Sequence, residues 1–354
     1  MKNLDKILSN YKNLPMDEFY KHVLYNKKYG YYFKKNPIGK KGDFVTSPGI
    51  TFLFSEIIAI WIISLWESLN KPKNFNVIEL GPGTGQMSKA MIYVFKKFPK
   101  FYESLNIFLY EKSLLLKSIQ KKNVNDKKVK WVSNFKLINN GPVIFFGNEF
   151  FDSIPIKQFE KNNNKLFERR VEINNLSNYK ISLKKITKKN QIQIKKYKTL
   201  RNANFIEFPK LGFEELSEVI NKIKNLSGGI MLIDYGYIKQ KNISTIQSVK
   251  SHKKNNLFEN IGEADITSLV NFKLLAEHFT KNKLKVEKTV TQSFFLKRMG
   301  LIERAEIISK NMSFKDKSDL YFRIKRLLDQ NLMGELFKVI FAGNIKKKKI
   351  LGFS

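Results

Sequence analysis

The sequence predicts an α/β fold in which helices cover both faces of a mostly parallel sheet. Two observations support this prediction. Residues 75–80, 106–111 and 142–146 are short, nearly unbroken apolar runs, as expected for parallel strands that are buried on both faces. Segments with helical spacing of their apolar residues lie between such runs, and this alternation is typical of a sheet built from strand–helix–strand units.

A glycine-rich turn joins the first of these strands to a helix. Residues 81–85 are Gly-Pro-Gly-Thr-Gly, and residues 86–98 repeat their apolar side chains at helical spacing. Glycines suit a turn that bends sharply and lies against a ligand, because a Cβ would obstruct both. The start of the helix adds free N–H groups and the positive end of the helix dipole. The turn is therefore the predicted ligand-binding segment of a nucleotide-binding sheet.

The spacing of the glycines indicates which ligand binds there. The dinucleotide fingerprint is G-x-G-x-x-G, whereas Gly81, Gly83 and Gly85 form the shorter pattern G-x-G-x-G, with Glu79 two residues before it. A pyrophosphate would need the wider loop. The tighter loop and the adjacent acid suit a ligand with an amino acid end and no phosphate, such as S-adenosylmethionine. The alternative is that the glycines only make a tight strand–helix connection.

Two residues that follow later strands are further candidates for cofactor binding. Glu111 ends the run 106–111, roughly 20–30 residues past the glycines, where a carboxylate that binds a ribose is expected. The alternative is that Glu111 only caps the following helix. Asn134 follows the short strand 129–132 and is a candidate partner for an adenine edge, with a simple turn residue as the alternative.

The end of the strand at 142–146 carries the principal catalytic candidates. Ligands bind outside the carboxyl ends of strands in open α/β sheets, and Asn148, Glu149 and Asp152 follow this strand. Asn148 is a cofactor-binding candidate. Glu149 and Asp152 are three residues apart, so we expect them to share one face of a helical turn. Two acids at this place make poor core packing, which favours a catalytic role over a capped loop.

Two other regions supply candidates around the same predicted site. Asp234 ends the strand at 230–233 and His252 lies in the loop that follows, and either is a hypothetical proton acceptor. Thr46 and Ser47 belong to a hydroxyl-rich loop before the apolar helix 52–69, and such a loop could fold over a bound cofactor. The alternative for Ser47 is that it caps this helix, with Pro48 in the first turn.

Composition narrows the classes of partner and ligand. The net charge is +34, but the basic residues are mostly lysines scattered along the chain without an RNA-binding module, so a nucleic acid partner is not expected. The chain has no cysteine and no pair of histidines with metal-ligand spacing, so no metal site is expected. No signal sequence is visible and the most apolar stretch, 57–65, is too short to span a membrane. We therefore expect a cytoplasmic protein without a transmembrane segment.

Changes of composition along the chain predict its organisation. Residues 157–198 are rich in Lys and Asn with short alternating apolar runs, which indicates an inserted β-rich subdomain. Residues 262–267 are expected to open a helix, with Asp265 or Thr267 as its cap. The predicted parts are an N-terminal helical extension over the cofactor site at 1–70, a first half of the cofactor domain at 71–156, the insertion at 157–210 and a second half at 211–354.

Several motifs together resemble a known family. GYY at 30–32, GDFVTSP at 42–48, ELGPGTG at 79–85, NEFFDSIPIKQF at 148–159, DYGY at 234–237, SHKK at 251–254, GEADIT at 262–267, FLKRMG at 295–300 and MGELFKV at 333–339 occur in this order. The chain resembles the MidA-type class I S-adenosylmethionine-dependent methyltransferases, whose mitochondrial member assists assembly of respiratory complex I. The likeness covers roughly residues 15–354 and departs from the family pattern at Gly49, where the family usually has Glu.

The resemblance implies a Rossmann-like class I methyltransferase fold with an N-terminal helical extension and an inserted small α+β subdomain. It also implies symmetric dimethylation of an arginine in the complex I subunit that builds the quinone site. The residues permit this chemistry, since carboxylates such as Glu149 and Asp152 can hold a guanidinium flat. An RNA or small-molecule methyltransferase and a non-catalytic S-adenosylmethionine-binding chaperone are the alternatives. The motif that follows the strand at 142–146 lacks the Asn-Pro-Pro-aromatic sequence of base-amine methyltransferases, because Glu149 follows Asn148. This difference disfavours a nucleic acid substrate.

Overall fold

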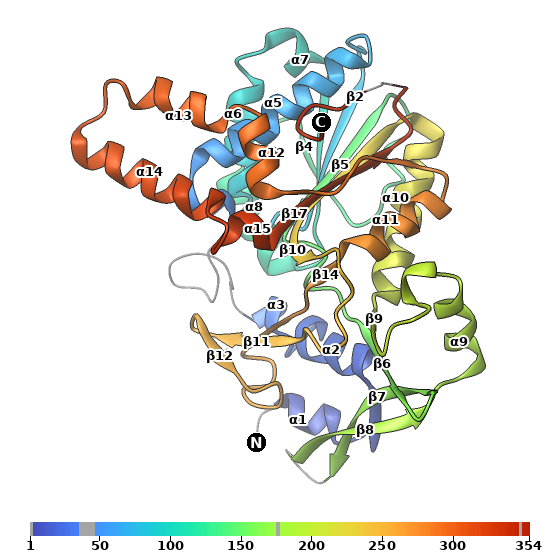
Figure 1. Cartoon of the computed structure of the whole chain (residues 1–354). Coiled ribbons are helices and arrows are strands. Elements are labelled where there is room, and N and C mark those ends of the chain that lie inside the picture. Colours follow the sequence, from blue (N-terminus) through green and yellow to red (C-terminus); the bar gives the residue numbers. More distant parts are fainter. Residues whose placement is uncertain (1–2, 35–46, 175–177, 347–348) are drawn as a thin grey trace. The chain divides into compact units, whose positions relative to one another are not determined.

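The chain folds into two compact units, each assembled from segments that are far apart in the sequence (Figure 1). The computed structural model describes residues 3–34, 47–174, 178–346 and 349–354. The smaller unit comprises residues 1–44, 151–217 and 237–278, and the larger unit comprises residues 45–150, 218–236 and 279–354. Each unit therefore combines three separate segments of the chain.

The larger unit is built on a mostly parallel sheet, as predicted. Strands β4, β3, β2, β5 and β10 are parallel neighbours in that order, and β17 pairs antiparallel with β10. Short strands β15 and β16 both pair with β17. The strands are β2 (Phe75–Leu80), β3 (Leu105–Tyr110), β4 (Val129–Val132), β5 (Val143–Asn148), β10 (Gly228–Tyr237), β15 (Lys285–Val286), β16 (Val290–Thr291) and β17 (Phe337–Gly343).

Burial on both faces of the sheet explains why the runs of apolar residues in these strands are nearly unbroken. Every residue of β2 is buried, because alternate side chains face helices on opposite sides of the sheet. One face packs on helices α5 (Phe52–Ser68) and α6 (Gln86–Phe95) in a continuous hydrophobic core. Helix α10 (Lys210–Leu226) lies on the opposite face. The predicted buried helix in the most apolar stretch is thus α5.

The remaining helices of the larger unit complete this core. Gln292 Nε2 donates to the Leu327 carbonyl (3.0 Å), which joins two of the C-terminal helices. These helices are α4 (Ser47–Ile50), α7 (Pro99–Ser104), α8 (Leu114–Asn123), α12 (Gln292–Arg298), α13 (Leu301–Ser309), α14 (Phe314–Leu328) and α15 (Met333–Leu336).

The smaller unit contains two antiparallel sheets. The first has the order β1-β7-β6-β9 with β8 also paired to β7, and the second has the order β12-β11-β13. Most strands of the first sheet come from the predicted insertion, but Asn13 of β1 pairs with Glu172 of β7. The N-terminal segment and the insertion therefore share one sheet. The strands of these two sheets are β1 (Asn13–Pro15), β6 (Lys157–Asn162), β7 (Lys165–Asn174), β8 (Asn178–Lys185), β9 (Phe205–Phe208), β11 (Gln247–Lys250), β12 (Lys253–Asn255) and β13 (Asp265–Thr267), whereas the short strand β14 (Val270–Asn271) belongs to neither.

Helices of the smaller unit cover these sheets. Phe19 and Tyr20 of α2 are fully buried in a core with Val171 of β7. A buried ion pair joins Lys157 Nζ to Asp17 (2.9 Å), so α2 is also fixed electrostatically. The helices are α1 (Asn3–Leu8), α2 (Met16–Tyr25), α3 (Tyr31–Lys34), α9 (Lys188–Lys195), the short 3-10 helix η1 (Lys198–Leu200) and α11 (Phe272–Lys281), which runs into the larger unit.

The helix expected to open at residues 262–267 is wrong. Residues 265–267 form β13, which pairs with β11. The helix begins only at Phe272, where Asn271 Oδ1 accepts from the Leu274 N–H (3.0 Å). Strand pairing with a distant segment overrides the local capping signal here.

None of the helices in the described residues combines the length and the apolar character that crossing a bilayer requires.

Trp61 is the largest fully buried side chain of α5 and should be critical for the stability of the larger unit. Its ring packs edge-on against Phe341 of β17 (5.3 Å between ring centres), and its Nε1 donates to the Leu351 carbonyl (3.1 Å). Trp61→Ala should lower the free energy of unfolding by about 3–5 kcal/mol, because it leaves a cavity and an unsatisfied carbonyl. Chemical denaturation followed by far-UV circular dichroism measures this change.

Ile60 on the same helix provides the control, since it is 36% exposed. Ile60→Ala should change the free energy of unfolding by no more than about 0.5 kcal/mol. An equal loss in both variants would show that α5 does not hold the core through Trp61.

Candidate functional site

The parallel strands bring most of the predicted site residues to one edge of the larger unit's sheet. Leu80 at the end of β2 lies opposite Tyr110 at the end of β3, and Asn148 of β5 lies opposite Ile233 of β10. Carboxyl ends of parallel strands meet at the same edge, where open α/β sheets bind ligands. The residues gathered there are Glu79, Gly81, Gly83, Gly85, Glu111, Asn134, Asn148, Glu149 and Asp234.

The glycine turn after β2 requires its glycines for conformation. Gly81, Gly83 and Gly85 have φ values of +64°, +55° and +80°, which L residues with a Cβ rarely adopt. A Cβ on Gly85 would also lie 2.7 Å from the side chain of Val124, the residue that directly follows α8. The turn therefore lies close to α8, and α6 begins directly after it.

Glu79 is a buried carboxylate beneath this turn. It is 4% exposed and accepts a hydrogen bond from the Ser88 hydroxyl of α6. Burial raises the pKa of Glu79 to about 7, although the hydrogen bonds from Ser88 oppose the rise. A cationic ligand group near Glu79 would favour its ionised form. The sequence did not single out Ser88, because a serine in an amphipathic helix carries no distinctive signal.

Glu111 lies directly after β3 and is held by two donors. Its Oε1 accepts from the Ser113 N–H (2.7 Å) and its Oε2 from Gln120 Nε2 (3.1 Å). Burial raises its pKa, and these hydrogen bonds lower it. A carboxylate offers about four lone-pair sites, so it can still accept from a hydroxyl. Glu111 does not cap α8 itself, because Ser113 is the residue whose side chain accepts from the Leu116 N–H.

Asn134 makes a local turn, and Ser47 does not cap α5. Asn134 is exposed, and its Oδ1 accepts from the Lys136 N–H (3.1 Å), which makes a local turn. Ser47 is fully buried at the start of α4, but Thr51 caps α5 through the Leu53 N–H (3.3 Å). The proposed Ser47 cap is therefore wrong. Thr46 lies outside the described residues.

Glu149 has an unusual backbone conformation at the end of β5. Its φ of +51° lies in the left-handed region, which costs a non-glycine residue about 1–3 kcal/mol. Its N–H donates to the Ile233 carbonyl of β10 (2.9 Å). Its Oε1 accepts from the Ser47 N–H (3.2 Å) and from Asn148 Nδ2 (3.0 Å). The carboxylate is therefore fixed at the sheet edge, and such outliers gather at functional sites.

The expected helical turn that would bring Glu149 and Asp152 to one face is wrong. Residues 149–154 contain bends and a turn but no helix, and the left-handed Glu149 cannot be part of an α-helical turn. Asp152 belongs to the smaller unit and is buried there. Its carbonyl accepts from the Tyr20 hydroxyl (3.2 Å) and the Ser268 N–H (3.0 Å).

The two hypothetical proton acceptors differ in environment. Asp234 is buried in β10, next to Ile233, and its Oδ1 accepts from the Tyr235 N–H (3.0 Å). It therefore lies on the strand that holds the Glu149 backbone. His252 is exposed in the turn between β11 and β12 of the smaller unit, with a φ of +62°.

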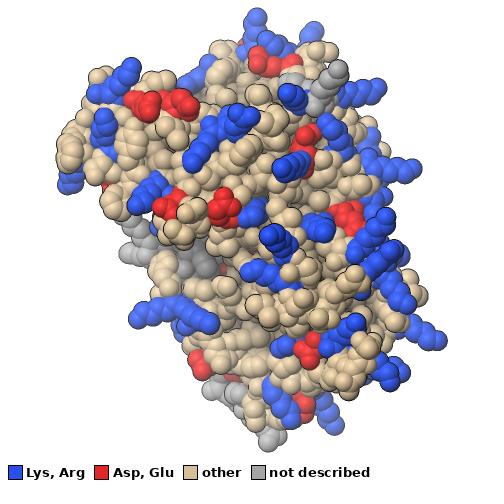
Figure 2. All heavy atoms as spheres, viewed as in Figure 1, with Lys and Arg blue, Asp and Glu red and all other residues tan. Residues whose placement is uncertain are grey.

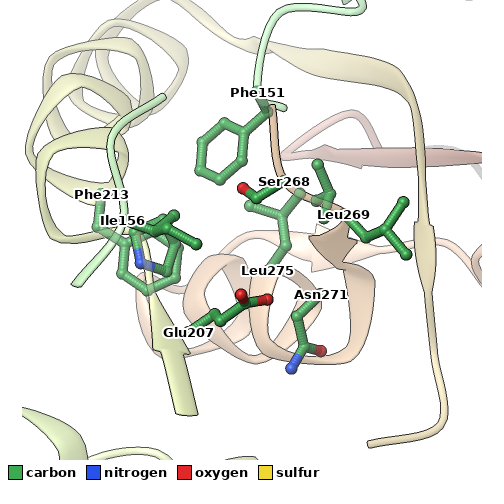
Figure 3. A pocket seen from close by; sticks show the side chains of 10 residues that line it. Phe151, Ile156, Glu207, Phe213, Ser268, Leu269, Asn271 and Leu275 are labelled. Atoms are coloured by element: carbon green, nitrogen blue, oxygen red, sulfur yellow. The ribbon is translucent and has the colours of Figure 1, made fainter. Parts of the chain in front are cut away.

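A hollow of about 340 Å³, including solvent space at its mouth, lies within the smaller unit (Figure 3). Glu207 is buried at its wall and accepts from Gln158 Nε2 (2.9 Å), the Thr245 N–H (2.9 Å) and the Thr245 hydroxyl (2.5 Å). Burial raises the pKa of Glu207. These contacts tie β6 and β9 to the loop before β11. The hollow is lined by Phe151, Ile156, Glu207, Pro209, Phe213, Ser268, Leu269, Val270, Asn271 and Leu275.

The distribution of charged side chains bears on binding of a nucleic acid and of a metal ion. Figure 2 shows Lys and Arg spread over one face, with Asp and Glu among them, rather than gathered in a single stripe. Within the part of the chain that the structure describes, no group of three His, Asp or Glu side chains is placed to hold a metal ion.

Comparisons with known proteins identify the family of this chain. A family model described as an S-adenosyl-L-methionine-dependent methyltransferase matches residues 57–290. The chain is 25% identical over 352 residues to the mitochondrial protein arginine methyltransferase NDUFAF7 of Xenopus laevis, covering 92% of this chain and 80% of the relative. It is 28% identical over 348 residues to the Homo sapiens protein of that name, covering 90% and 78%.

A solved structure shares the fold. A protein from Burkholderia thailandensis, crystallised with S-adenosyl-homocysteine, superposes with a TM-score of 0.83 at 20% identity. The match covers 99% of this chain and 92% of that chain. The predicted class I methyltransferase fold is therefore confirmed.

The expected cytoplasmic location is contradicted, because the Xenopus, Drosophila and human relatives are all named as mitochondrial. The prediction rested on the absence of a visible signal sequence and of an apolar stretch long enough to span a membrane. Neither property identifies the compartment in which a protein works.

The family model matches residues 57–290, which is more than half of the chain. The chain therefore belongs to the S-adenosyl-L-methionine-dependent methyltransferases and uses that cofactor.

Proposed function

We propose that this methyltransferase transfers the methyl group to arginine side chains of a protein substrate. The names of the relatives at 25–28% identity, protein arginine methyltransferase, support this acceptor. The proposed substrate is a subunit of respiratory complex I, which agrees with the family resemblance, and the proposed product is symmetric dimethylarginine. Nucleic acid is not the proposed acceptor.

The fixed carboxylate of Glu149 is the observation that carries the proposal. A guanidinium is planar, always protonated and rich in donors, so it is best held by an oriented carboxylate. The Ser47 N–H and Asn148 Nδ2 orient the Glu149 carboxylate, and the β10 carbonyl of Ile233 holds its backbone. A strained residue held by three neighbours is expected where substrate geometry matters.

The residues at the sheet edge fit the cofactor. The left-handed glycines let the main chain approach a ligand, and the buried Glu79 suits its ammonium group. Glu111 keeps acceptor capacity for ribose hydroxyls. When bound, S-adenosylmethionine supplies an activated methyl group on a sulfonium.

Positioning supplies most of the proposed catalysis. Glu149 would hold the guanidinium and turn one of its nitrogens toward the methyl group, because oriented reactants avoid a large entropic cost. The bound cofactor would supply the methyl group: its C–S bond would break as the new N–C bond forms, with S-adenosyl-homocysteine as the leaving group. The nitrogen then loses a proton, for which Asp234 on the neighbouring strand is the proposed acceptor. Asp152 and His252, in the smaller unit, stay predictions from the sequence.

Glu149→Gln should abolish methyl transfer while leaving cofactor binding intact. The amide keeps the shape of the side chain but removes the charge that holds a guanidinium. We expect the rate to fall at least about 100-fold, as for removal of one oriented electrostatic group. Transfer of tritium from labelled S-adenosylmethionine to protein in a cell lysate measures the rate, and calorimetry with S-adenosyl-homocysteine measures binding.

Glu67→Gln is the matched control, because the Glu67 side chain is 54% exposed at the end of α5. It should transfer methyl groups at the wild-type rate. Label in nucleic acid or in small molecules instead of protein would refute the arginine proposal. The absence of any label would favour a non-catalytic, cofactor-binding chaperone.

Gly83→Val should block cofactor binding. A β-branched residue is strained at a φ of +55°, and its side chain would stand in the turn that approaches the ligand. Gly300→Val is the control, since Gly300 has a φ of +80° at the start of α13, in the same unit. Both variants should lose thermal stability, but only the first should lose stabilisation by S-adenosyl-homocysteine. Equal stabilisation of both variants would contradict the proposed role of the turn.

Cofactor affinity should fall as the pH drops from 8 to 6. With a pKa of about 7, Glu79 is increasingly protonated below neutrality, whereas pairing with an ammonium group requires the carboxylate. Below this pKa the affinity should decrease by up to about tenfold per pH unit, because binding must release one proton. Calorimetry in buffers of different ionisation enthalpy detects that proton. Glu79→Gln should flatten the profile; an unchanged slope would exclude Glu79 as the titrating group.

A further inference from the structure

Gln120 makes an unusual set of contacts in the last turn of α8. The residue is fully buried. Its Nε2 donates both to the Gly83 carbonyl (2.8 Å) and to Glu111 Oε2 (3.1 Å), and its Oε1 accepts from Trp131 Nε1 of β4 (3.0 Å). One amide therefore touches the glycine turn, the carboxylate after β3 and the next strand of the sheet.

These contacts fix which way the amide points. An indole N–H can only donate, so Trp131 must face the amide oxygen. Both amide hydrogens are then directed at the two acceptors, the Gly83 carbonyl and Glu111. Of these, the bond to Glu111 is charge-assisted whenever the carboxylate is ionised.

We infer that Gln120 is a positioning residue that couples the two ends of the cofactor site. It holds the turn proposed for the methionine end and the carboxylate proposed for the ribose in one fixed relation. The Ser113 N–H holds the other oxygen of Glu111, so the plane of the carboxylate is set from both sides. This inference rests on the roles proposed above for the turn and for Glu111.

The close packing of the turn on α8 makes the coupling direct. A Cβ added to Gly85 would lie 3.5 Å from Gln120 Cγ, and the Gly83 carbonyl already accepts from Gln120 Nε2 at 2.8 Å. A change at residue 120 therefore acts on the turn through packing as well as through hydrogen bonds. Because Gln120 is fully buried, water does not compete for the hydrogen bonds of its amide.

Binding of S-adenosyl-homocysteine to Q120M tests the inference. Methionine keeps the length of the side chain but donates no hydrogen bond. Calorimetry should show about a tenfold loss of affinity, which corresponds to one charge-assisted hydrogen bond. Wild-type affinity in folded Q120M would overturn the inference.

Q292M is the matched control for loss of stability alone. Gln292 is equally buried in α12 of the same unit, and its Nε2 also donates to a carbonyl, that of Leu327. Both variants should melt at lower temperature, but Q292M should bind S-adenosyl-homocysteine within about twofold of wild type. An equal loss of affinity in Q292M would reduce Gln120 to a stabilising residue and overturn the inference.

A double-mutant cycle with E111Q separates coupling from two independent effects. If Gln120 acts through Glu111, the two losses of affinity should not multiply in the double variant. Multiplicative losses would overturn the coupling. Wild-type affinity of E111Q itself would instead reject the role proposed for Glu111, and a failure of arginine methylation would change none of these binding results.

W131F covers the case in which Q120M does not fold. It keeps an aromatic ring but removes the donor that orients the amide oxygen. Affinity for S-adenosyl-homocysteine should fall about threefold, since the amide can then rotate away from Glu111. Unchanged affinity in W131F would overturn the inference.

Discussion

The close approach of the glycine turn to α8 is the constraint on which the proposed cofactor site depends. At Gly85 a side chain would collide with Val124, so only a residue without a Cβ lets the turn lie on this helix. That contact places the Gly83 carbonyl within reach of Gln120 and, through it, of Glu111. The side chain of Gln120 therefore connects the turn, α8 and the end of β3.

Burial of carboxylates is a second property of the site. Glu79 and Glu111 are each less than 10% exposed, and burial raises the pKa of both. Keeping charged groups away from water costs free energy unless a partner compensates. Ser88, Ser113 and Gln120 supply part of that compensation with hydrogen bonds. A cationic and hydroxyl-bearing cofactor would supply more, which is a physical reason for these acids to favour binding.

The strained backbone of Glu149 lies at the same edge of the sheet, where the parallel strands end. Its left-handed backbone follows the last residue of β5, so Glu149 itself cannot form part of an α-helical turn with Asp152. The sequence-based expectation of a helical turn failed because it considered only the spacing of Glu149 and Asp152. The conformation of Glu149 is set instead by the hydrogen bond of its N–H to β10, a strand that lies far along the chain.

The sequence by itself determined the parallel sheet, the glycine turn and the acids at the ends of β2 and β3. These features depend on local patterns, namely nearly unbroken apolar runs, the spacing of glycines and the positions of acids near strand ends. It did not reveal Gln120 and Ser88, whose residue types are ordinary in helices and whose partners lie on other elements. It also predicted a helix at residues 262–267, where pairing with β11 makes a strand. Only the tertiary structure decided these features, because hydrogen bonds between residues far apart in sequence leave no local pattern to read.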